Sequence, residues 1–208
     1  MPLLLNVPYS EKDEAKALGA KWNPNLKKWY VTDKKDYHKF TRWFTNQNTD
    51  LIICNQLYII VGEQNCFKCQ KPTSVVSLAS DSYLIIEDEH FELIEEDINF
   101  IQDVDYLPES LKKYLNDNYR FYNGYSKTTH SNYFGNHCDS CDVLQGNFFL
   151  YSEPDSPFFM DSVEKAQNLK VLRIKFTFDL AISGTVGWCS GDHMIKEYAK
   201  VTDLDLKL

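Results

Sequence analysis

The chain has 208 residues, of which 43% are hydrophobic and 14% aromatic, so it can build a core and is not expected to be disordered. Its net charge of −8 argues against a protein that coats nucleic acid over its whole surface, because lysine and arginine drive such binding. No run of about 20 apolar residues predicts a membrane helix, and the start lacks the basic flank of a signal peptide, so we expect no membrane partner and a cytoplasmic protein.

The charge is distributed unevenly along the chain. Residues 1–45 carry nine Lys or Arg against five Asp or Glu, a net charge of +4, which leaves −12 for the remainder. Such asymmetry predicts a basic module that contacts nucleic acid and is joined to an acidic body. We therefore expect two domains, 1–45 and 51–208, joined by the polar stretch between them.

The first domain is expected to fold as strand, helix, hairpin and helix. An apolar run at 3–7 predicts the strand, and Ser10 is the expected N-cap of the first helix. Two short strands meet at the turn 23–25. A second helix, capped by Thr32 or Asp33, follows, because aromatic residues recur after it at helical spacing.

The second domain is dominated by strand patterns. Strands are expected at 57–61, 75–78, 83–86 and 171–178, an extended segment at 119–125, a helix at 108–118, an acidic flank at 87–105 and a glycine-punctuated loop at 184–191. The predicted fold class is α+β, with a small basic N-terminal module joined to a strand-rich body that resembles a zinc ribbon.

Four of the six cysteines form two Cys-x-x-Cys pairs, Cys66 with Cys69 and Cys138 with Cys141. Each pair places two thiolates on one side of a tight turn, and two such turns supply the four ligands of a tetrahedral zinc ion. Because 68 residues separate the pairs, the metal would tie together distant parts of the fold. Four thiolates leave no open position for water, which predicts structural and not catalytic Zn²⁺.

Other roles for these residues stay open at this point. A single pair would be read as ordinary or redox-active thiols, and His137 could replace one thiolate as a ligand. Cys54 and Cys189 have no partner at a useful spacing and are expected to be buried free thiols.

The basic module also carries a candidate site for single-stranded nucleic acid. Bases stack on exposed aromatic rings while lysines contact phosphates, and the candidate residues for these roles are Lys21, Trp22, Lys27, Lys28, Trp29 and Tyr30. A domain of about 45 residues needs its large side chains inside, however, so core packing is the role we expect first for both tryptophans.

Catalysis has weaker support in the sequence. The acidic run Glu87–Asp97 could gather Mg²⁺, but such runs are usually solvated surface. Cys189 lies near His193, yet a third member of a catalytic group is not identifiable, so a structural loop is expected there. We therefore expect the protein to be a binding protein rather than an enzyme.

The N-terminal residues resemble a known family. The segments that carry the resemblance are Asn6–Tyr9, Lys16–Pro24, Lys28–Val31 and Trp43, and they resemble a small bacterial domain of unknown function that is often attached to plasmid-borne primases, antirestriction proteins and related DNA-processing proteins. The resemblance implies a bacterial or mobile-element setting and an association with DNA-processing proteins. It names no reaction.

The body is similar to uncharacterised bacterial proteins with the same paired cysteines. The segments concerned are Cys66–Val76, Ser126–Thr129, Asn136–Cys141 and Leu144–Leu150. This similarity supports zinc and implies no activity.

Three hypotheses about function follow. The first is a non-catalytic zinc-binding accessory protein whose N-terminal module contacts single-stranded nucleic acid and whose body contacts another protein. The second is an acidic inhibitor, such as an immunity or anti-defence protein, that binds a basic protein partner. The third is a nucleic-acid-processing enzyme.

Overall fold

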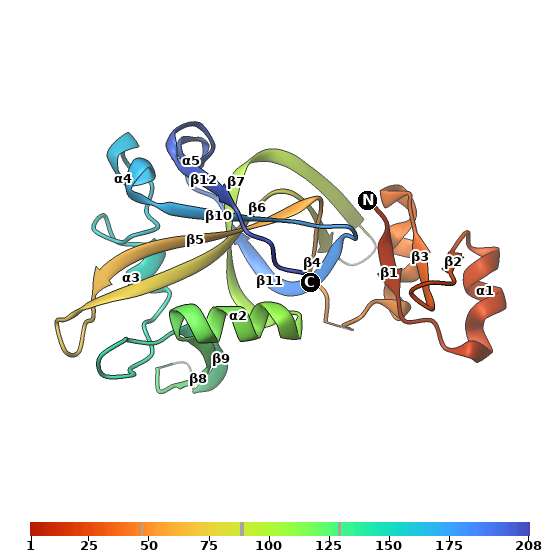
Figure 1. Cartoon of the computed structure of the whole chain (residues 1–208), viewed down its shortest axis with the longest axis horizontal. Coiled ribbons are helices and arrows are strands. Elements are labelled where there is room, and N and C mark those ends of the chain that lie inside the picture. Colours follow the sequence, from red (N-terminus) through yellow and green to blue (C-terminus); the bar gives the residue numbers. More distant parts are fainter. Residues whose placement is uncertain (47, 88–89, 129) are drawn as a thin grey trace.

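The structure is a computed structural model that describes residues 1–46, 48–87, 90–128 and 130–208. Residue 47 of the expected linker, residues 88 and 89 of the acidic run and residue 129 of the Ser126–Thr129 segment lie outside the described residues. Figure 1 shows a small N-terminal unit at one end of the long axis and a larger body at the other.

The N-terminal unit is a three-stranded antiparallel sheet, ordered β1-β3-β2, with helices around it. Its elements are β1 (Leu3–Leu5), η1 (Tyr9–Glu11), α1 (Lys12–Ala17), β2 (Lys21–Asn23), β3 (Lys28–Val31) and η2 (Lys34–Trp43). The predicted succession of strand, helix, hairpin and helix is confirmed.

Two details of this unit differ from the prediction. The second helix, η2, is a 3₁₀ helix, and its buried residues Tyr37, Phe40 and Trp43 recur every three positions, which is one turn of such a helix. Asp33 caps it by accepting a hydrogen bond from the backbone of Lys35, as one of the two predicted caps. The cap predicted at Ser10 is wrong, because η1 includes that residue.

The body is built on a seven-stranded sheet ordered β12-β10-β5-β6-β4-β11-β7 and a separate hairpin, β8–β9. Because β6 also pairs with β7, the strands β4, β6, β7 and β11 close a ring. The elements are β4 (Leu51–Ile53), β5 (Gln56–Asn65), β6 (Pro72–Glu87), β7 (His90–Tyr106), α2 (Glu109–Tyr119), β8 (Phe121–Ser126), β9 (Ser131–Asn136), α3 (Phe148–Tyr151), α4 (Val163–Asn168), β10 (Lys170–Lys175), β11 (Leu180–Gly187), α5 (Asp192–Tyr198) and β12 (Lys200–Asp203). The α+β class and the strand-rich body are confirmed.

Strand boundaries in the body depart from the prediction. The strands expected at 75–78 and 83–86 are two halves of β6, and the acidic flank belongs mostly to β7. Ser80 and Ser82, between the two predicted strands, lie where the β6–β7 register shifts, and the Ser80 hydroxyl donates to the Ser82 carbonyl at 3.0 Å. The loop expected at 184–191 begins as β11, which continues to Gly187.

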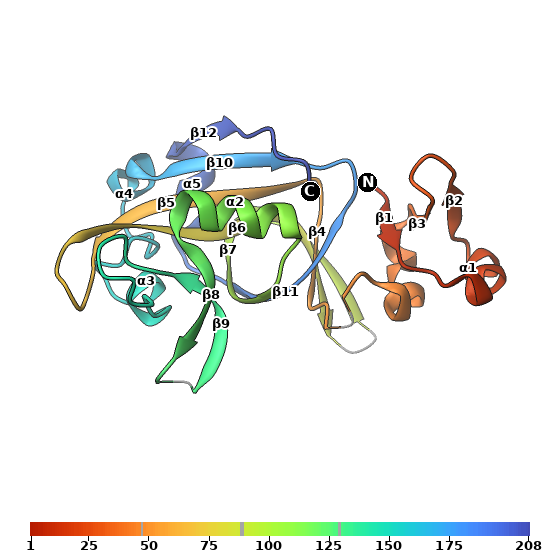
Figure 2. The ribbon, with the colours of Figure 1, turned by 60° about the horizontal axis from the view of Figure 1, so that its bottom comes forward.

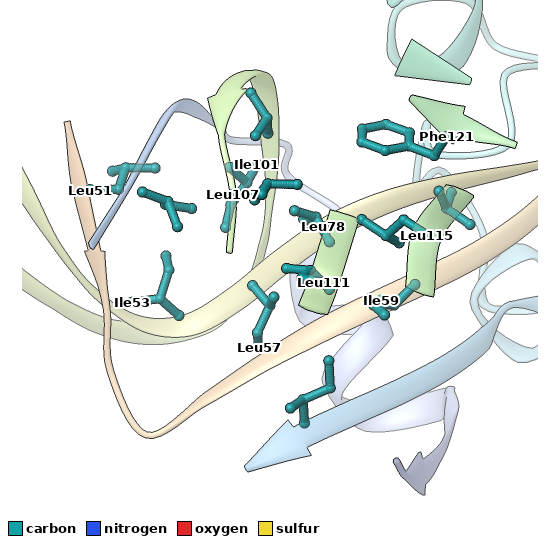
Figure 3. Packing of buried hydrophobic residues seen from close by; sticks show 14 of the residues in the cluster. Leu51, Ile53, Leu57, Ile59, Leu78, Ile101, Leu107, Leu111, Leu115 and Phe121 are labelled. Atoms are coloured by element: carbon teal, nitrogen blue, oxygen red, sulfur yellow. The ribbon is translucent and has the colours of Figure 1, made fainter. Parts of the chain in front are cut away.

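The sheet is covered on both faces, which explains the alternation in its strands. On one face Leu57 and Ile59 of β5 pack beneath α2, with Leu111 and Leu115 inserted from the helix (Figure 3). Tyr58 and Ile60 belong to the cluster on the other face, with residues of α3, α4 and α5. Figure 2 shows α2 lying across the sheet, with β8–β9 extending away from it.

The N-terminal unit packs directly on the body. Its core side chains share one cluster with residues of β4, β6 and β11, namely Ile52, Leu84 and Ala181, and with the thiol of Cys54. Leu3 forms a parallel bridge with Asp179, and the Tyr37 hydroxyl donates to the Asp179 carboxylate at 2.7 Å. The division into domains 1–45 and 51–208 stays a prediction, but the two parts share a core.

Helices of the described residues are all too short or too polar to cross a membrane.

Candidate functional site

The four cysteines of the two pairs meet at one point in the body. Their sulfur atoms all lie within 4.8 Å of one another; Cys66 and Cys141 are 3.7 Å apart and Cys69 and Cys138 are 3.6 Å apart. A disulfide requires about 2.05 Å, whereas sulfurs around a tetrahedral ion with metal–sulfur bonds of about 2.3 Å lie about 3.8 Å apart. The spacing therefore fits a metal ion and not disulfides.

The two pairs lie on turns with the same backbone hydrogen bonds. In the first turn the amide of Cys66 donates to the carbonyl of Lys71 and the amide of Gln70 donates to the carbonyl of Cys66. In the second turn Cys138, Asp142 and Val143 make the same two bonds. The residue after each second cysteine is left-handed, with φ of 60° at both Gln70 and Asp142. We call these turns the Cys66 knuckle and the Cys138 knuckle.

Each knuckle closes a different hairpin. The Cys66 knuckle joins β5 to β6, and the Cys138 knuckle follows β9 and is closed by a bridge between His137 and Leu144. The hairpins are also joined by hydrogen bonds: the Thr73 hydroxyl accepts from the Asp139 amide, and the Asp139 carboxylate accepts from the Ser74 amide, both at 2.9 Å. The ligands are thus placed by two hairpins that already contact each other.

Hydrogen-bond donors surround the sulfurs. The backbone amide of Ser140 donates to the Cys138 sulfur at 3.4 Å, and the side-chain amide of the fully buried Gln145 donates to the Cys66 sulfur at 3.5 Å. The same Gln145 amide donates to the carbonyl of Val143, and its oxygen accepts from Gln64. Such donors stabilise thiolates and orient metal ligands. This role of Gln145 was not predicted from the sequence.

The electrostatics of the cluster also fit a cation. Burial alone would raise the pKa of Cys66, but hydrogen bonds from the amides of Cys69 and Lys68 lower it to about 6. At Cys141 the amide of Val143 favours the thiolate, yet burial and the neighbouring thiols raise the pKa to about 12. Four sulfurs at this spacing cannot all ionise by themselves, because like charges repel. A divalent ion would allow all four to be thiolates.

His137 is buried beside the centre and has other contacts. Its ring stacks on Tyr122 at 3.8 Å between centroids, its Nδ1 contacts the carbonyl of Gly135, and burial lowers its pKa. Gly124 makes room for the ring, since a Cβ there would lie 2.4 Å from the imidazole. The alternative that His137 replaces a thiolate is not supported by this geometry.

The two remaining cysteines lie elsewhere. Cys54 is fully buried in the core shared with the N-terminal unit, and burial raises its pKa to about 11. Cys189 is partly buried; its thiol contacts the carbonyl of Met160, while the ring of His193 contacts the carbonyl of Ser190. Both contacts are to backbone, as expected of a structural loop.

A second candidate site is a groove on the N-terminal unit. The groove has a volume of about 520 Å³ and lies between the segment Leu5–Lys12 and the β2–β3 hairpin. Its lining residues are Leu5, Asn6, Val7, Pro8, Tyr9, Lys12, Trp22, Lys27, Lys28 and Trp29, so it contains three aromatic rings, three lysines and no carboxylate. We call it the Trp22 groove.

Four of the unit's five acidic residues, all except Asp13, have partners outside the groove lining. Arg42 pairs with Glu11 and Glu14, and Asp36 pairs with Lys39. Lys12 lies over the Tyr9 ring at 4.0 Å, and Lys28 donates to the Asn6 side chain at 2.5 Å. The lysines of the groove therefore give it a positive potential, which suits a phosphate ligand.

The structure brings together four of the six residues predicted to bind nucleic acid. Trp22, Lys27, Lys28 and Trp29 line the groove, whereas Lys21 and Tyr30 are paired across the hairpin outside the lining. Lys12 and Tyr9 were missed. The available signal was an aromatic ring followed by a lysine three residues later, but Lys12 was read only as part of the predicted helix and Tyr9 only as part of the family resemblance.

Core packing, the first expectation for the tryptophans, is wrong for Trp22. Its side chain is 48% exposed, and Tyr9 is 83% exposed. Trp29 is half-buried, packs against the core and supports Trp22 edge-on at 5.6 Å. The core is filled instead by Tyr37, Phe40 and Trp43 of η2, which frees Trp22 for the surface.

Comparison with known proteins concerns the N-terminal unit. Residues 3–45 match the family model described as a domain of unknown function, DUF5710. Two proteins of Escherichia coli, both named DNA primase TraC, are each 51% identical over 39 residues, which is 19% of this chain and 3% and 4% of theirs. No solved structure matches the chain. The N-terminal unit therefore carries the small domain of unknown function that the sequence suggested, and it shares that segment with DNA primases.

Proposed function

We propose that the protein is a non-catalytic, nucleic-acid-associated accessory protein that contacts single-stranded DNA through the Trp22 groove. The observation that carries this proposal is the combination of exposed aromatic rings with three lysines and no carboxylate in one groove. Single-strand binders stack bases on rings and track the backbone with cations. The similarity of this segment to part of two DNA primases supports the same reading.

The test is fluorescence anisotropy with a labelled oligothymidylate of about 16 nucleotides, the upper end of common site sizes. Changing Lys27 and Lys28 to Glu is expected to weaken binding more than about tenfold and to reduce the salt slope by about 1.4, since each phosphate contact contributes about 0.7. Trp22→Ala is expected to cost about 1 to 3 kcal/mol of binding through lost stacking.

The matched control changes Lys16 and Lys35 to Glu. Both lysines are exposed on the same unit, and neither lines the groove, so the change in net charge is identical. Binding that is unmeasurable at low salt, or that falls equally in both double variants, would reject the groove as the DNA site.

We further propose that the metal is Zn²⁺ and that its role is structural. Four thiolates complete a tetrahedral shell, which leaves no open position for a substrate or water. Two knuckles on two hairpins are the arrangement of a zinc ribbon, and the need to keep all four thiols reduced supports a cytoplasmic location.

The zinc proposal predicts a metal content and a labelling pattern. Purified protein should contain one equivalent of zinc, and at mildly alkaline pH a thiol reagent should label Cys189 but not the four ligands. Cys54 should also stay unlabelled, because it is buried and its pKa is raised to about 11. Chelation should expose the four ligand thiols and unfold the body. Folded protein without metal would overturn the assignment.

A further inference from the structure

Exposed phenylalanines surround the Cys66 knuckle. Phe67 lies inside the knuckle, and Phe148 and Phe149 lie on α3; the Phe67 and Phe149 rings stack at 5.9 Å, and Phe148 meets Phe149 edge-on at 5.6 Å. All three are large exposed side chains, and Phe148 is 59% exposed. Contiguous exposed apolar side chains of this kind mark interaction surfaces in folded proteins. We call these residues the phenylalanine patch.

A groove of about 520 Å³ adjoins this patch. Phe148 and Phe149 form one wall, the outer half of the β8–β9 hairpin with Tyr133 forms another, and Asp103 and Asp105 of β7 contribute carboxylates. We call it the Asp103 groove. In Figures 1 and 2 α3 lies beside β8–β9 in both views. The Asp103 groove therefore combines apolar surface with negatively charged side chains.

The carboxylates of this groove are available to a ligand. Both are exposed, and neither forms an ion pair with a lysine or arginine in the described parts of the chain. Asp103 accepts hydrogen bonds from Asn147 at 2.8 Å and from Thr185 at 3.3 Å, which fix its position. The backbone of Asp103 is in the left-handed region, with φ of 49°, and it lies opposite the shift in register between Ser183 and Thr185 of β11. Bulges often redirect side chains at functional places.

We propose that the phenylalanine patch and the Asp103 groove form a docking surface for an extended, basic segment of a partner protein. An apolar or aromatic side chain of the segment would pack on Phe148 and Phe149, and a neighbouring Lys or Arg would pair with Asp103 and Asp105. Charge complementarity selects this occupant. A nucleic-acid strand is disfavoured there because the carboxylates repel phosphates. The inference is independent of the Trp22 groove and stands or fails separately from it.

The probe is a library of short random peptides displayed on phage and selected against the full-length, zinc-loaded protein. Enriched peptides are expected to carry Lys or Arg beside an aromatic or aliphatic residue. A synthetic copy of the best peptide should bind the wild type at least about tenfold more tightly than Asp103→Asn/Asp105→Asn or Phe148→Ser, as is typical of central interface residues. The matched control, Asp155→Asn/Asp205→Asn, removes the same charge from exposed positions outside the groove and should bind like the wild type.

Zinc content is measured in every variant, so that a loss of binding is not confused with a loss of folding. Enrichment of acidic or neutral peptides, no enrichment at all, or equal binding to wild type and Asp103→Asn/Asp105→Asn would overturn the proposal. So would self-association in sedimentation that Phe148→Ser abolishes, because a second copy would then be the occupant. The proposal would also be overturned if labelled DNA bound the wild type and Phe148→Ser abolished that binding.

Discussion

Gln145 lies fully buried beside the four-cysteine cluster, where its amide nitrogen donates to the sulfur of Cys66. Its side chain also joins the two hairpins, because its oxygen accepts from Gln64 on β5. A buried amide with these contacts orients one ligand and stabilises its negative charge. It is therefore the side chain outside the four cysteines on which metal affinity should depend most.

Changing Gln145 to Leu is expected to lower zinc affinity by about 10- to 100-fold, as is typical for the loss of a hydrogen bond to a ligand. Competition with a chromogenic chelator measures the affinity. Gln64→Ala is the matched control, because it removes the outer contact and leaves the donor to the sulfur in place. An affinity that is unchanged in Gln145→Leu would show that the amide has no part in binding.

At the scale of residues, the sequence identified the four cysteines because the spacing within each pair is set by a single turn. It did not identify Gln145, whose position depends on how two hairpins meet and leaves no local pattern. The exposure of Trp22 was missed for a similar reason. Which of several aromatic residues fills a core is decided by packing, not by composition.

At the scale of elements, the two knuckles share one geometry, including a left-handed residue after each second cysteine. Neither Gln70 nor Asp142 is glycine, the residue best suited to that conformation. Asp142 compensates by accepting hydrogen bonds from Arg120 and Tyr122, which also lower the pKa of its carboxyl group. Gln70 has a local bond, from its side chain to the carbonyl of Phe67.

Substitutions at Gln70 test this geometry. Gln70→Val should lower the free energy of unfolding by about 1 to 2 kcal/mol, because a branched side chain is strained at positive φ. Gln70→Gly should match or exceed the wild type. Urea unfolding of the zinc-loaded protein gives both values. Lys71→Val, at the exposed next position with negative φ, should have little effect, and equal losses at both positions would argue against a left-handed requirement.

The elements predicted from the sequence were those with a clear period, such as the helix at 108–118 and the strands of the central sheet. The prediction divided the continuous strand β6 into two strands, 75–78 and 83–86, on either side of Ser80 and Ser82. The Ser80 hydroxyl donates to the Ser82 carbonyl and accepts from the Ser82 amide at a bulge, whereas the Ser82 hydroxyl donates to the Glu95 carboxylate. The 3₁₀ character of η2 was visible in its three-residue spacing, but it was read as an α-helical period.

At the scale of the whole molecule, Asp179 fastens the N-terminal unit to the body. Its buried carboxylate accepts from Tyr37, and its backbone bridges to Leu3 and Pro2. This contact joins residues that are far apart in the chain, so periodicity and composition could not predict it. Tyr37→Phe leaves the carboxylate without that donor and should cost about 1 to 3 kcal/mol of unfolding free energy.

Burial raises the pKa of Asp179 above its ordinary value, although Tyr37 partly opposes the shift. The unfolded chain therefore ionises at lower pH than the folded one, and the stability contributed by protonated Asp179 is lost as pH rises through the folded pKa. The unfolding free energy of Asp179→Asn minus that of the wild type should thus increase as pH rises above about 4. Urea titrations at a series of pH values measure this difference, to which the titrating cysteines contribute equally in the two proteins. A flat difference would contradict the buried, ionising Asp179.

The position of the ligands along the chain also constrains the order of events during synthesis. Because 68 residues lie between Cys69 and Cys138, a nascent chain carries the first two thiols without the other two until the second hairpin emerges. The N-terminal unit can meet Ile52 and Leu84 earlier, but its contacts with Asp179 and Ala181 must wait until those later residues are made. All four cysteines are therefore made before the last contacts of the N-terminal unit, and a chain that ended between Cys141 and Asp179 would leave part of the apolar surface of that unit uncovered.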